Sequence, residues 1–117
     1  MTIRELIKQK LDKLWQNFTN LTQDELSQIL VELSALLGNI GENICLLEQK
    51  FINKQLELWQ ENNEMSAKEC EIRSKVTKEY LEYSQIKVLE KATIESLRSI
   101  KYRLRILQNE QQGCRNL

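Results

Sequence analysis

Histidine and proline do not occur in this chain of 117 residues, and glycine occurs only at Gly38, Gly41 and Gly113. Without histidine, the usual zinc and di-iron ligand sets cannot be assembled, and neither can a Ser-His or Cys-His nucleophile pair. The lack of proline and the scarcity of glycine argue against the turn-rich chain of an all-β fold and favour long helices. Most of the commoner enzyme classes are therefore excluded, and we expect no cofactor.

An excess of either charge is also lacking, because 17 lysine and arginine residues balance 17 aspartate and glutamate residues. The chain as a whole is therefore not a strongly basic nucleic-acid binder, and any argument from charge must be local. Its length fits a single helical domain over residues 1–117.

Long apolar runs are missing as well. Short runs such as Ile29–Val31 and Ala35–Leu37 end at glutamate or glycine, well below the roughly 20 apolar residues of a membrane span. The first residues lack the apolar core of a secretory signal. We therefore expect a cytoplasmic protein without membrane contact, in which Cys45, Cys70 and Cys114 are reduced thiols.

Three capping boxes mark the starts of helices. In each box a serine or threonine can cap the helix, while a glutamate three residues later returns a hydrogen bond to the cap residue. The pairs are Thr2 with Glu5, Thr22 with Glu25, and Ser66 with Glu69. They predict helices over residues 3–19, 23–62 and 67–111, the last of which ends at Gly113 in the position of a C-terminal cap.

The middle helix keeps its apolar register across two glycines. Spacings of four and three alternate through Leu26, Leu30, Leu33, Leu37, Ile40, Ile44, Leu47 and Phe51. A loop has no reason to preserve this register, so we predict one continuous helix in which the glycines let another helix approach closely. The alternative is a bend or hinge at residues 38–41, because each glycine costs about 0.8–1.0 kcal/mol inside a helix.

The two long helices would each reach about 60 Å, more than a compact globule of this size needs. We therefore predict an all-α fold: a long antiparallel, coiled-coil-like helical hairpin with the short N-terminal helix packed at its open end as a three-helix bundle. In this hairpin the outgoing arm is mainly acidic and the returning arm mainly basic. Ion pairs between the arms are expected, for example near Glu32 and Arg98.

Apolar residues also lie on or beside the helix seam near the tip of the predicted hairpin, where no third helix covers them. The candidates for a partner or oligomer interface are Leu46, Phe51, Trp59, Tyr80, Leu81 and Val88. Two helices alone bury little area, so these residues indicate that another chain packs there. We expect a homo-oligomer, most simply a two-fold dimer.

A locally basic segment lies near the C-terminal end. Its candidates for nucleic-acid contact are Lys87, Lys91, Arg98, Lys101, Tyr102, Arg103 and Arg105. A basic helix with an aromatic ring could follow a phosphate backbone while the ring stacks on a base. A single-stranded nucleic-acid-binding or recombination accessory protein is therefore one alternative function. In the interpretation that we favour, these residues pair with the acidic arm and complement the helix dipole.

Four glutamates form two E-x-x-E pairs, Glu61 with Glu64 and Glu79 with Glu82. Carboxylates one turn apart on neighbouring helices can hold magnesium. The spacing is similar to that of the all-α nucleotide pyrophosphatases, although Glu82 stands where that family has aspartate. The hairpin would place Glu79 beside Lys50, away from the first pair. A magnesium-dependent pyrophosphatase is the second alternative, and we assign no catalytic or metal-binding residue.

Several short segments in residues 33–117 carry a family resemblance. They are Leu37-Gly38, Leu47-Glu48, Ser66–Glu69, Leu89–Ala92, Leu97–Leu104 and Arg115–Leu117. This part of the chain resembles small α-helical proteins of unassigned function from tailed phages and prophages. The resemblance implies a phage accessory protein that acts by binding a partner, and it supplies no functional residues.

We therefore expect a non-enzymatic protein–protein interaction factor that works in the host cytoplasm. Its expected partners are a second copy of itself and a host or phage protein, and inhibition of a host protein such as a defence nuclease is the expected activity.

Overall fold

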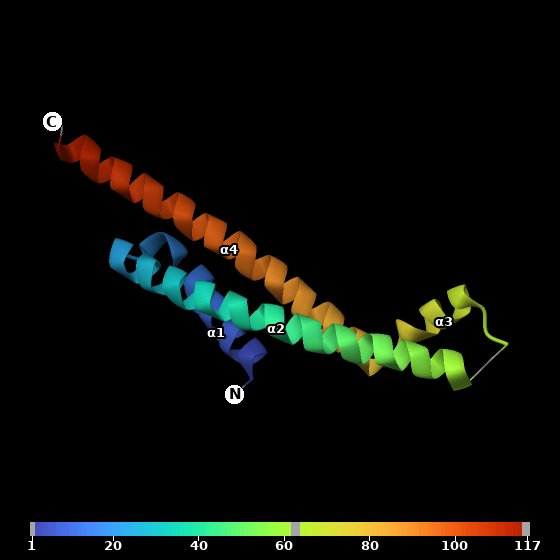
Figure 1. The fold of residues 1–117 in the computed structure, drawn as a ribbon. Coiled ribbons are helices and arrows are strands. Elements are labelled where there is room, and N and C mark those ends of the chain that lie inside the picture. Colours follow the sequence, from blue (N-terminus) through green and yellow to red (C-terminus); the bar gives the residue numbers. More distant parts are fainter. Residues whose placement is uncertain (1, 62–63, 116–117) are drawn as a thin grey trace. The chain divides into compact units, whose positions relative to one another are not determined.

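The structure is a computed structural model that describes the backbone of residues 2–61 and 64–115 and the side chains of residues 2–61 and 64–111. These residues form four α-helices and one short 3-10 helix with no strand, so the predicted all-α class is confirmed (Figure 1). The elements are α1 (Ile3–Gln16), η1 (Phe18–Asn20), α2 (Gln23–Glu61), α3 (Ala67–Ser74) and α4 (Lys78–Arg115).

Side-chain caps stand at the three predicted helix starts. Thr2 and Glu5 form a capping box, in which the Glu5 amide donates to the Thr2 Oγ1 at 3.2 Å and the Thr2 amide donates to a Glu5 carboxylate oxygen at 3.3 Å. Thr22 and Glu25 make the same two bonds at 3.2 and 3.3 Å. Ser66 accepts a bond of 3.1 Å from the amide three residues later. Each cap stabilises its helix by about 1 kcal/mol.

The helix α2 runs without interruption through Gly38 and Gly41. The preserved apolar register therefore predicted this helix correctly, and no break into two shorter helices occurs at residues 38–41, while a bend or hinge there stays a prediction. A Cβ atom placed on either glycine would meet no neighbouring heavy atom within 4 Å. Within the described chain no helix packs closely against the glycines, and the space beside them is open.

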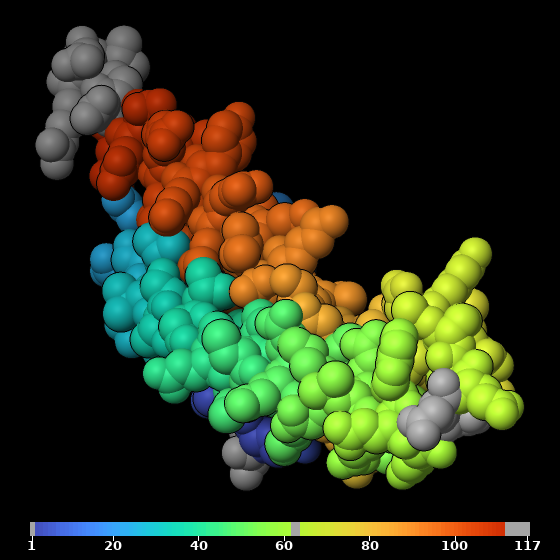
Figure 2. Space-filling model, turned by 45° about the vertical axis from the view of Figure 1, so that its right-hand side comes forward, coloured from blue at the N-terminus to red at the C-terminus, as the bar shows by residue number. Residues whose placement is uncertain are grey.

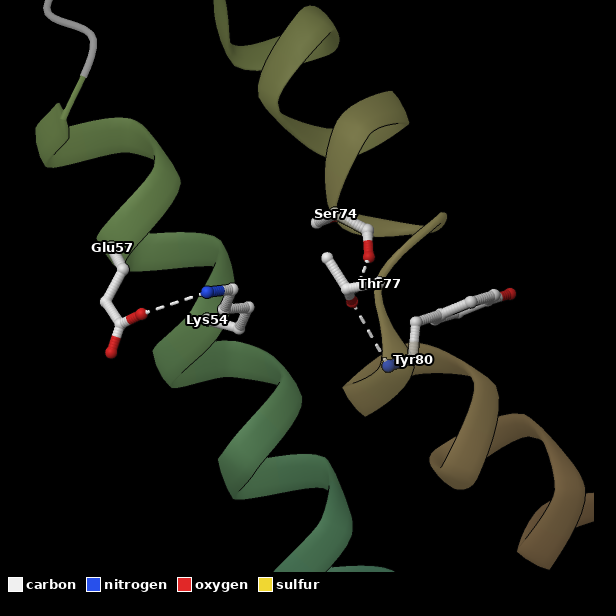
Figure 3. Close-up of polar contacts among 5 residues, drawn as sticks. All are labelled: Lys54, Glu57, Ser74, Thr77 and Tyr80. Atoms are coloured by element: carbon white, nitrogen blue, oxygen red, sulfur yellow. Dashed lines mark hydrogen bonds and ion pairs between the residues drawn. The ribbon is translucent and has the colours of Figure 1, made fainter.

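The predicted helix 67–111 is interrupted at residues 75–77. The Ser74 hydroxyl donates to the Glu71 carbonyl at 2.7 Å, and the Thr77 hydroxyl donates to the Ser74 carbonyl at 2.6 Å. Thr77 then accepts a bond of 3.3 Å from the Tyr80 amide and so caps α4 (Figure 3). Hydroxyl side chains compete in this way with the helical backbone bonds. At its other end α4 continues through Gly113 to Arg115, beyond the predicted cap.

The chain divides into two compact units. Unit 1 comprises Met1–Asn39 with Glu90–Leu117, and unit 2 comprises Ile40–Leu89. In the part of the chain that the structure describes, the buried apolar residues of unit 1 are Ile7, Leu11, Leu14, Leu26, Leu33, Leu36, Leu97 and Ile100. Those of unit 2 are Ile40, Ile44, Met65, Cys70, Ile86 and Leu89. The sequence predicted one domain without this division, and α2 and α4 each contribute residues to both units.

In unit 1, α1 is attached to two other helices by its buried face and by polar contacts. Lys10 of α1 forms an ion pair with Glu32 of α2. The Trp15 indole N–H donates to the Ser96 Oγ of α4 at 3.1 Å, which satisfies a hydroxyl that is almost fully buried. The core of unit 1 therefore contains side chains from α1, α2 and α4.

Helix α2 also meets the length and composition of a membrane span, and it is the one described helix that does so. Only 22% of its most apolar 18-residue window is buried. The expectation of no such stretch was too strict, because single glutamates and glycines interrupt short runs without removing the apolar character of the whole window. A core helix of a soluble protein passes the same criterion, so this observation assigns no location.

Candidate interaction surfaces

Unit 2 exposes more large apolar side chains than it buries. Of its described residues, eight large hydrophobic residues are exposed, against the six apolar residues of its core. The exposed residues are Leu46, Ile52, Leu56, Trp59, Ile72, Val76, Leu81 and Val88. In unit 1 the balance is reversed, with eight buried apolar residues and only Trp15, Val31 and Tyr102 exposed. An apolar surface of this kind is typical of a site for another helix or chain.

Three of these residues form a stripe on α2. Ile52, Leu56 and Trp59 follow one another at spacings of four and three, so they share one helical face, and they are 44%, 54% and 45% exposed. We call these three residues the apolar stripe. On α4, Leu81 and Val88 lie seven residues apart on another exposed face. The second half of α2, in green, forms outer surface in the view of Figure 2.

The predicted interface residues divide into two groups. Leu46, Trp59, Leu81 and Val88 are exposed, with fractions of 45% to 70%. Phe51 and Tyr80 are only partly exposed.

The rings of Phe51 and Tyr80 pack on each other with their centroids 5.1 Å apart, and Phe51 also stacks on Tyr83 at 6.0 Å. These rings join α2 to α4 inside unit 2, and because both side chains stay partly exposed, their place in a partner interface stays a prediction.

Sequence reasoning missed the other exposed apolar residues of unit 2. Ile52 and Leu56 carried a usable signal, because their spacing to Trp59 is that of one helical face. Ile72 and Val76 would share one face of the predicted helix 67–111, yet they are 60% and 85% exposed. The break at residues 75–77 interrupts the helix on which that shared face depends.

The candidate nucleic-acid residues fall into different surroundings. Arg98, Tyr102 and Arg103 line an open hollow of about 400 Å³ in unit 1, together with Trp15 and Phe18. We call this group the aromatic–basic hollow. The candidates outside its lining are Lys87, Lys91, Lys101 and Arg105. The sequence carried no signal for Trp15 and Phe18 at this place, because no pattern along the chain connects them to residues 80 or more positions later.

Four residues of the basic segment do not form the expected pairs with the acidic arm in the described part of the chain. Arg98, Lys101, Arg103 and Arg105 make no ion pair with any residue whose side chain the structure describes. The expected acidic neighbour, Glu32, is bound instead to Lys10 of α1. Pairs such as Lys54 with Glu57, 3.5 Å apart, join residues of one helix (Figure 3).

The environment of Glu32 favours its charged form. Hydrogen bonds from Lys10 and from Gln28, the latter at 3.0 Å, lower the pKa of its carboxyl below the usual 4.5, and burial opposes this only in part. Glu32 and Lys10 also line a smaller hollow of about 340 Å³ with Leu6 and Ile29. This pair adds a polar contact between α1 and α2 to the apolar packing of α1.

The glutamates of the pyrophosphatase alternative are not gathered into a metal site. No group of three or more His, Cys, Asp or Glu side chains is placed to hold a metal ion within the described residues. Glu61 and Glu64 are exposed, and Glu82 lies 3.8 Å from Lys78. This alternative therefore has no geometric support.

The cysteines serve no common site. Cys70 is buried and its thiol lies 3.3 Å from the Gln55 carbonyl oxygen, to which it donates, whereas Cys45 is exposed. The side chain of Cys114 lies outside the described residues.

No family model, no curated protein and no solved structure matches this chain. The resemblance to phage proteins therefore stays an expectation.

Proposed function

We propose that this protein is a non-enzymatic interaction factor that assembles with a second copy of itself through unit 2. The observation that supports this most strongly is the balance of apolar side chains in unit 2, where eight large hydrophobic residues are exposed and six apolar residues are buried among the described residues. A second helix laid along the apolar stripe would remove Ile52, Leu56 and Trp59 from water. In a two-fold dimer each copy supplies the same stripe, so the gain is doubled.

Burial of the apolar stripe alone does not supply the free energy that association costs, so the proposed interface extends beyond the stripe. Full burial of a large apolar side chain contributes about 1.5–3 kcal/mol. The three stripe residues are roughly half exposed, so they offer a few kcal/mol per copy. Association costs about 4–15 kcal/mol in lost freedom. Further exposed residues, with Leu81 and Val88 as the candidates, therefore have to join the contact.

The proposal retains the finer architecture expected from the sequence. In it the two long helices form an antiparallel, coiled-coil-like hairpin, and α1 completes a three-helix bundle at the open end. The shared core of α1, α2 and α4 within unit 1 supports the bundle.

The wider role that we propose is that of a phage-type accessory protein of the host cytoplasm, without cofactor or catalytic residues. Such a protein would act on a host protein, for example a defence nuclease, by covering part of its surface. The resemblance of residues 33–117 to phage proteins and the exposed helical surface of unit 2 support this role. In this proposal the apolar face of α2 contacts protein and not lipid, so the expressed chain should remain in the supernatant when membranes are sedimented.

Light scattering after size-exclusion chromatography tests the assembly. At micromolar concentration the full chain should have the mass of a dimer, twice its 13.9 kDa. The variant L56E/W59E should have the mass of a monomer, because two charges would be buried at the interface. The control is Val31→Glu, which places one such charge on an exposed position of α2 in unit 1. A monomeric wild-type protein, or equal dissociation by the control, would contradict the proposal.

A pull-down from host lysate tests the wider role. The wild-type bait should retain a host protein that the L56E/W59E bait loses and the Val31→Glu bait keeps. If all three baits return only themselves, the accessory role through unit 2 is wrong.

A further inference from the structure

The aromatic–basic hollow of unit 1 is a second surface, separate in its chemistry from the apolar stripe. Its walls come from α1, η1 and the second half of α4, all within unit 1. Its volume of about 400 Å³ lies within the range of roughly 300–1,000 Å³ found for ligand sites. A side chain or a nucleobase fits a hollow of this size.

Flat aromatic surface is available at the hollow. Tyr102 is 65% exposed and Trp15 is 50% exposed, so a large part of each ring meets solvent. The bond from the Trp15 indole to Ser96 and the stacking of Trp15 on Phe18, with centroids 4.9 Å apart, hold the indole in place. A ring that is fixed before binding offers a stacking platform at low entropic cost.

Uncompensated positive charge lies at the same place. Residues 97–109 contain four lysine and arginine residues and no acidic residue. The Nε of Arg103 is enclosed and has no hydrogen-bond partner among the described residues. Arg98 is exposed and makes no ion pair with a described side chain. Buried donors are normally satisfied, so the Arg103 guanidinium is a group that an oxygen acceptor would complete.

We propose that the aromatic–basic hollow binds single-stranded nucleic acid, with a base stacked on Trp15 or Tyr102 and the neighbouring phosphates bound by Arg98 and Arg103. Aromatic faces beside unpaired arginines are the combination that single-stranded nucleic acid requires, because every base has a face to stack and every linkage carries a negative charge. An acidic protein surface would match the charge and leave the exposed ring faces without a flat partner. Single-strand binding goes beyond the protein–protein contacts proposed for unit 2 and does not depend on them.

Fluorescence anisotropy with the full-length protein tests the class of ligand. A labelled oligothymidylate of about 20 nucleotides should bind at about 50 mM salt with a Kd in the range of about 10⁻⁴–10⁻⁶ M. An abasic strand of the same length has the same phosphates and no bases, and it should bind about fivefold more weakly or worse. Equal affinity for the two strands, absence of binding, or equally tight binding of polyglutamate would overturn the proposal.

Two double variants distinguish binding in the aromatic–basic hollow from general electrostatic attraction to the basic part of α4. R98Q/R103Q removes two charges that line the hollow, and K101Q/R105Q removes two charges from the same helix outside it. The first variant should lower the slope of log K against log salt by about 1.4, at about 0.7 per phosphate contact. The second should change the slope and the affinity much less. Equal losses in the two variants would show that only net charge matters, and the hollow would have no role.

Tryptophan fluorescence tests the stacking itself. In Trp59→Phe the sole indole is Trp15, and its emission should be quenched as the oligonucleotide is added, because a base stacks near it. In Trp15→Phe the quenching should be lost, and Tyr102→Ala should weaken binding about fivefold or more. Circular dichroism should give the same helix content for each variant. Quenching that persists in Trp15→Phe would place the bound strand elsewhere and overturn the proposal.

Discussion

Units 1 and 2 use the same kinds of residue and differ in what they do with them. Unit 1 packs side chains from three helices into its core and leaves three large apolar residues exposed among its described residues, whereas unit 2 leaves eight. The charges of the two units also differ. Unit 1 contains ten basic and eight acidic residues, and unit 2 contains seven basic and nine acidic residues. Each unit has a third helix, but α1 buries Ile7, Leu11 and Leu14 in unit 1, whereas Cys70 is the one apolar side chain that α3 buries in unit 2.

The largest effect is expected when leucine is changed to alanine at two positions of α2, one in each unit. Leu33 in unit 1 is fully buried, so Leu33→Ala should lower the free energy of unfolding by about 2–5 kcal/mol. Leu56 in unit 2 is 54% exposed, so Leu56→Ala should cost well under half as much in the monomer. Urea unfolding at low protein concentration measures both. Equal costs would show that the two units do not differ in packing.

Protein concentration should stabilise unit 2 more than unit 1. If a second copy covers unit 2, each tenfold rise in concentration above the dimer Kd stabilises the assembly by about 1.4 kcal/mol. Amide hydrogen exchange should therefore slow first at residues 40–61 and 78–89 as concentration rises. The L56E/W59E variant is the control and should show no such dependence. If hydrogen exchange slowed only in unit 1, the dimer interface would lie in unit 1 and not in unit 2.

A smaller effect on stability is expected when the cap at the break between α3 and α4 in unit 2 is removed. Thr77→Ala removes the cap on the Tyr80 amide and should destabilise the protein by about 1 kcal/mol. Thr19, an exposed residue of η1 in unit 1, makes no described side-chain cap, and Thr19→Ala should change stability much less. Thermal unfolding followed by circular dichroism compares the two. A Thr77 variant as stable as the wild type would show that the cap is not needed at this break.

The sequence was sufficient where a single helix determines its own structure. The boxes at Thr2 and Thr22 join residues three apart, and the register through Gly38 is a property of one helix, so all three could be read from the chain. The break at residues 75–77 was missed because an apolar pattern continued across it, although the hydroxyls of Ser74 and Thr77 bond to backbone carbonyls there.

Sequence patterns were insufficient where distant segments meet. The aromatic–basic hollow joins Trp15 to Tyr102, and the partner of Glu32 turned out to be Lys10 and not the basic segment of α4. A chain with 17 charges of each sign offers many equally acceptable ion pairs, so charge alone could not select one. The exposed stripe at Ile52, Leu56 and Trp59 was only partly found, because helical spacing looks the same for a buried face and for an exposed one.

The smallest expected difference between the units is the stability that one ion pair in each contributes, and how that contribution changes with pH. The pKa of Glu32 is lower in the folded protein than in the unfolded chain, so its stabilising effect is present above about pH 4.5 and is lost as the pH falls through the folded pKa. Both side chains of the pair with Lys10 are about one-third exposed, which limits the effect to about 0.2–1 kcal/mol. Glu32→Gln should therefore lower stability at pH 7, and its difference from the wild type should shrink as the pH falls below about 4.5, as measured by urea unfolding at each pH. The control is Glu57→Gln in unit 2, where the carboxylate is 60% exposed and its pair with Lys54 lies within one helix, so its loss should be smaller at pH 7. An equal effect of the two variants would mean that the contact between α1 and α2 gains nothing from this charge, and that apolar packing alone holds the third helix of unit 1.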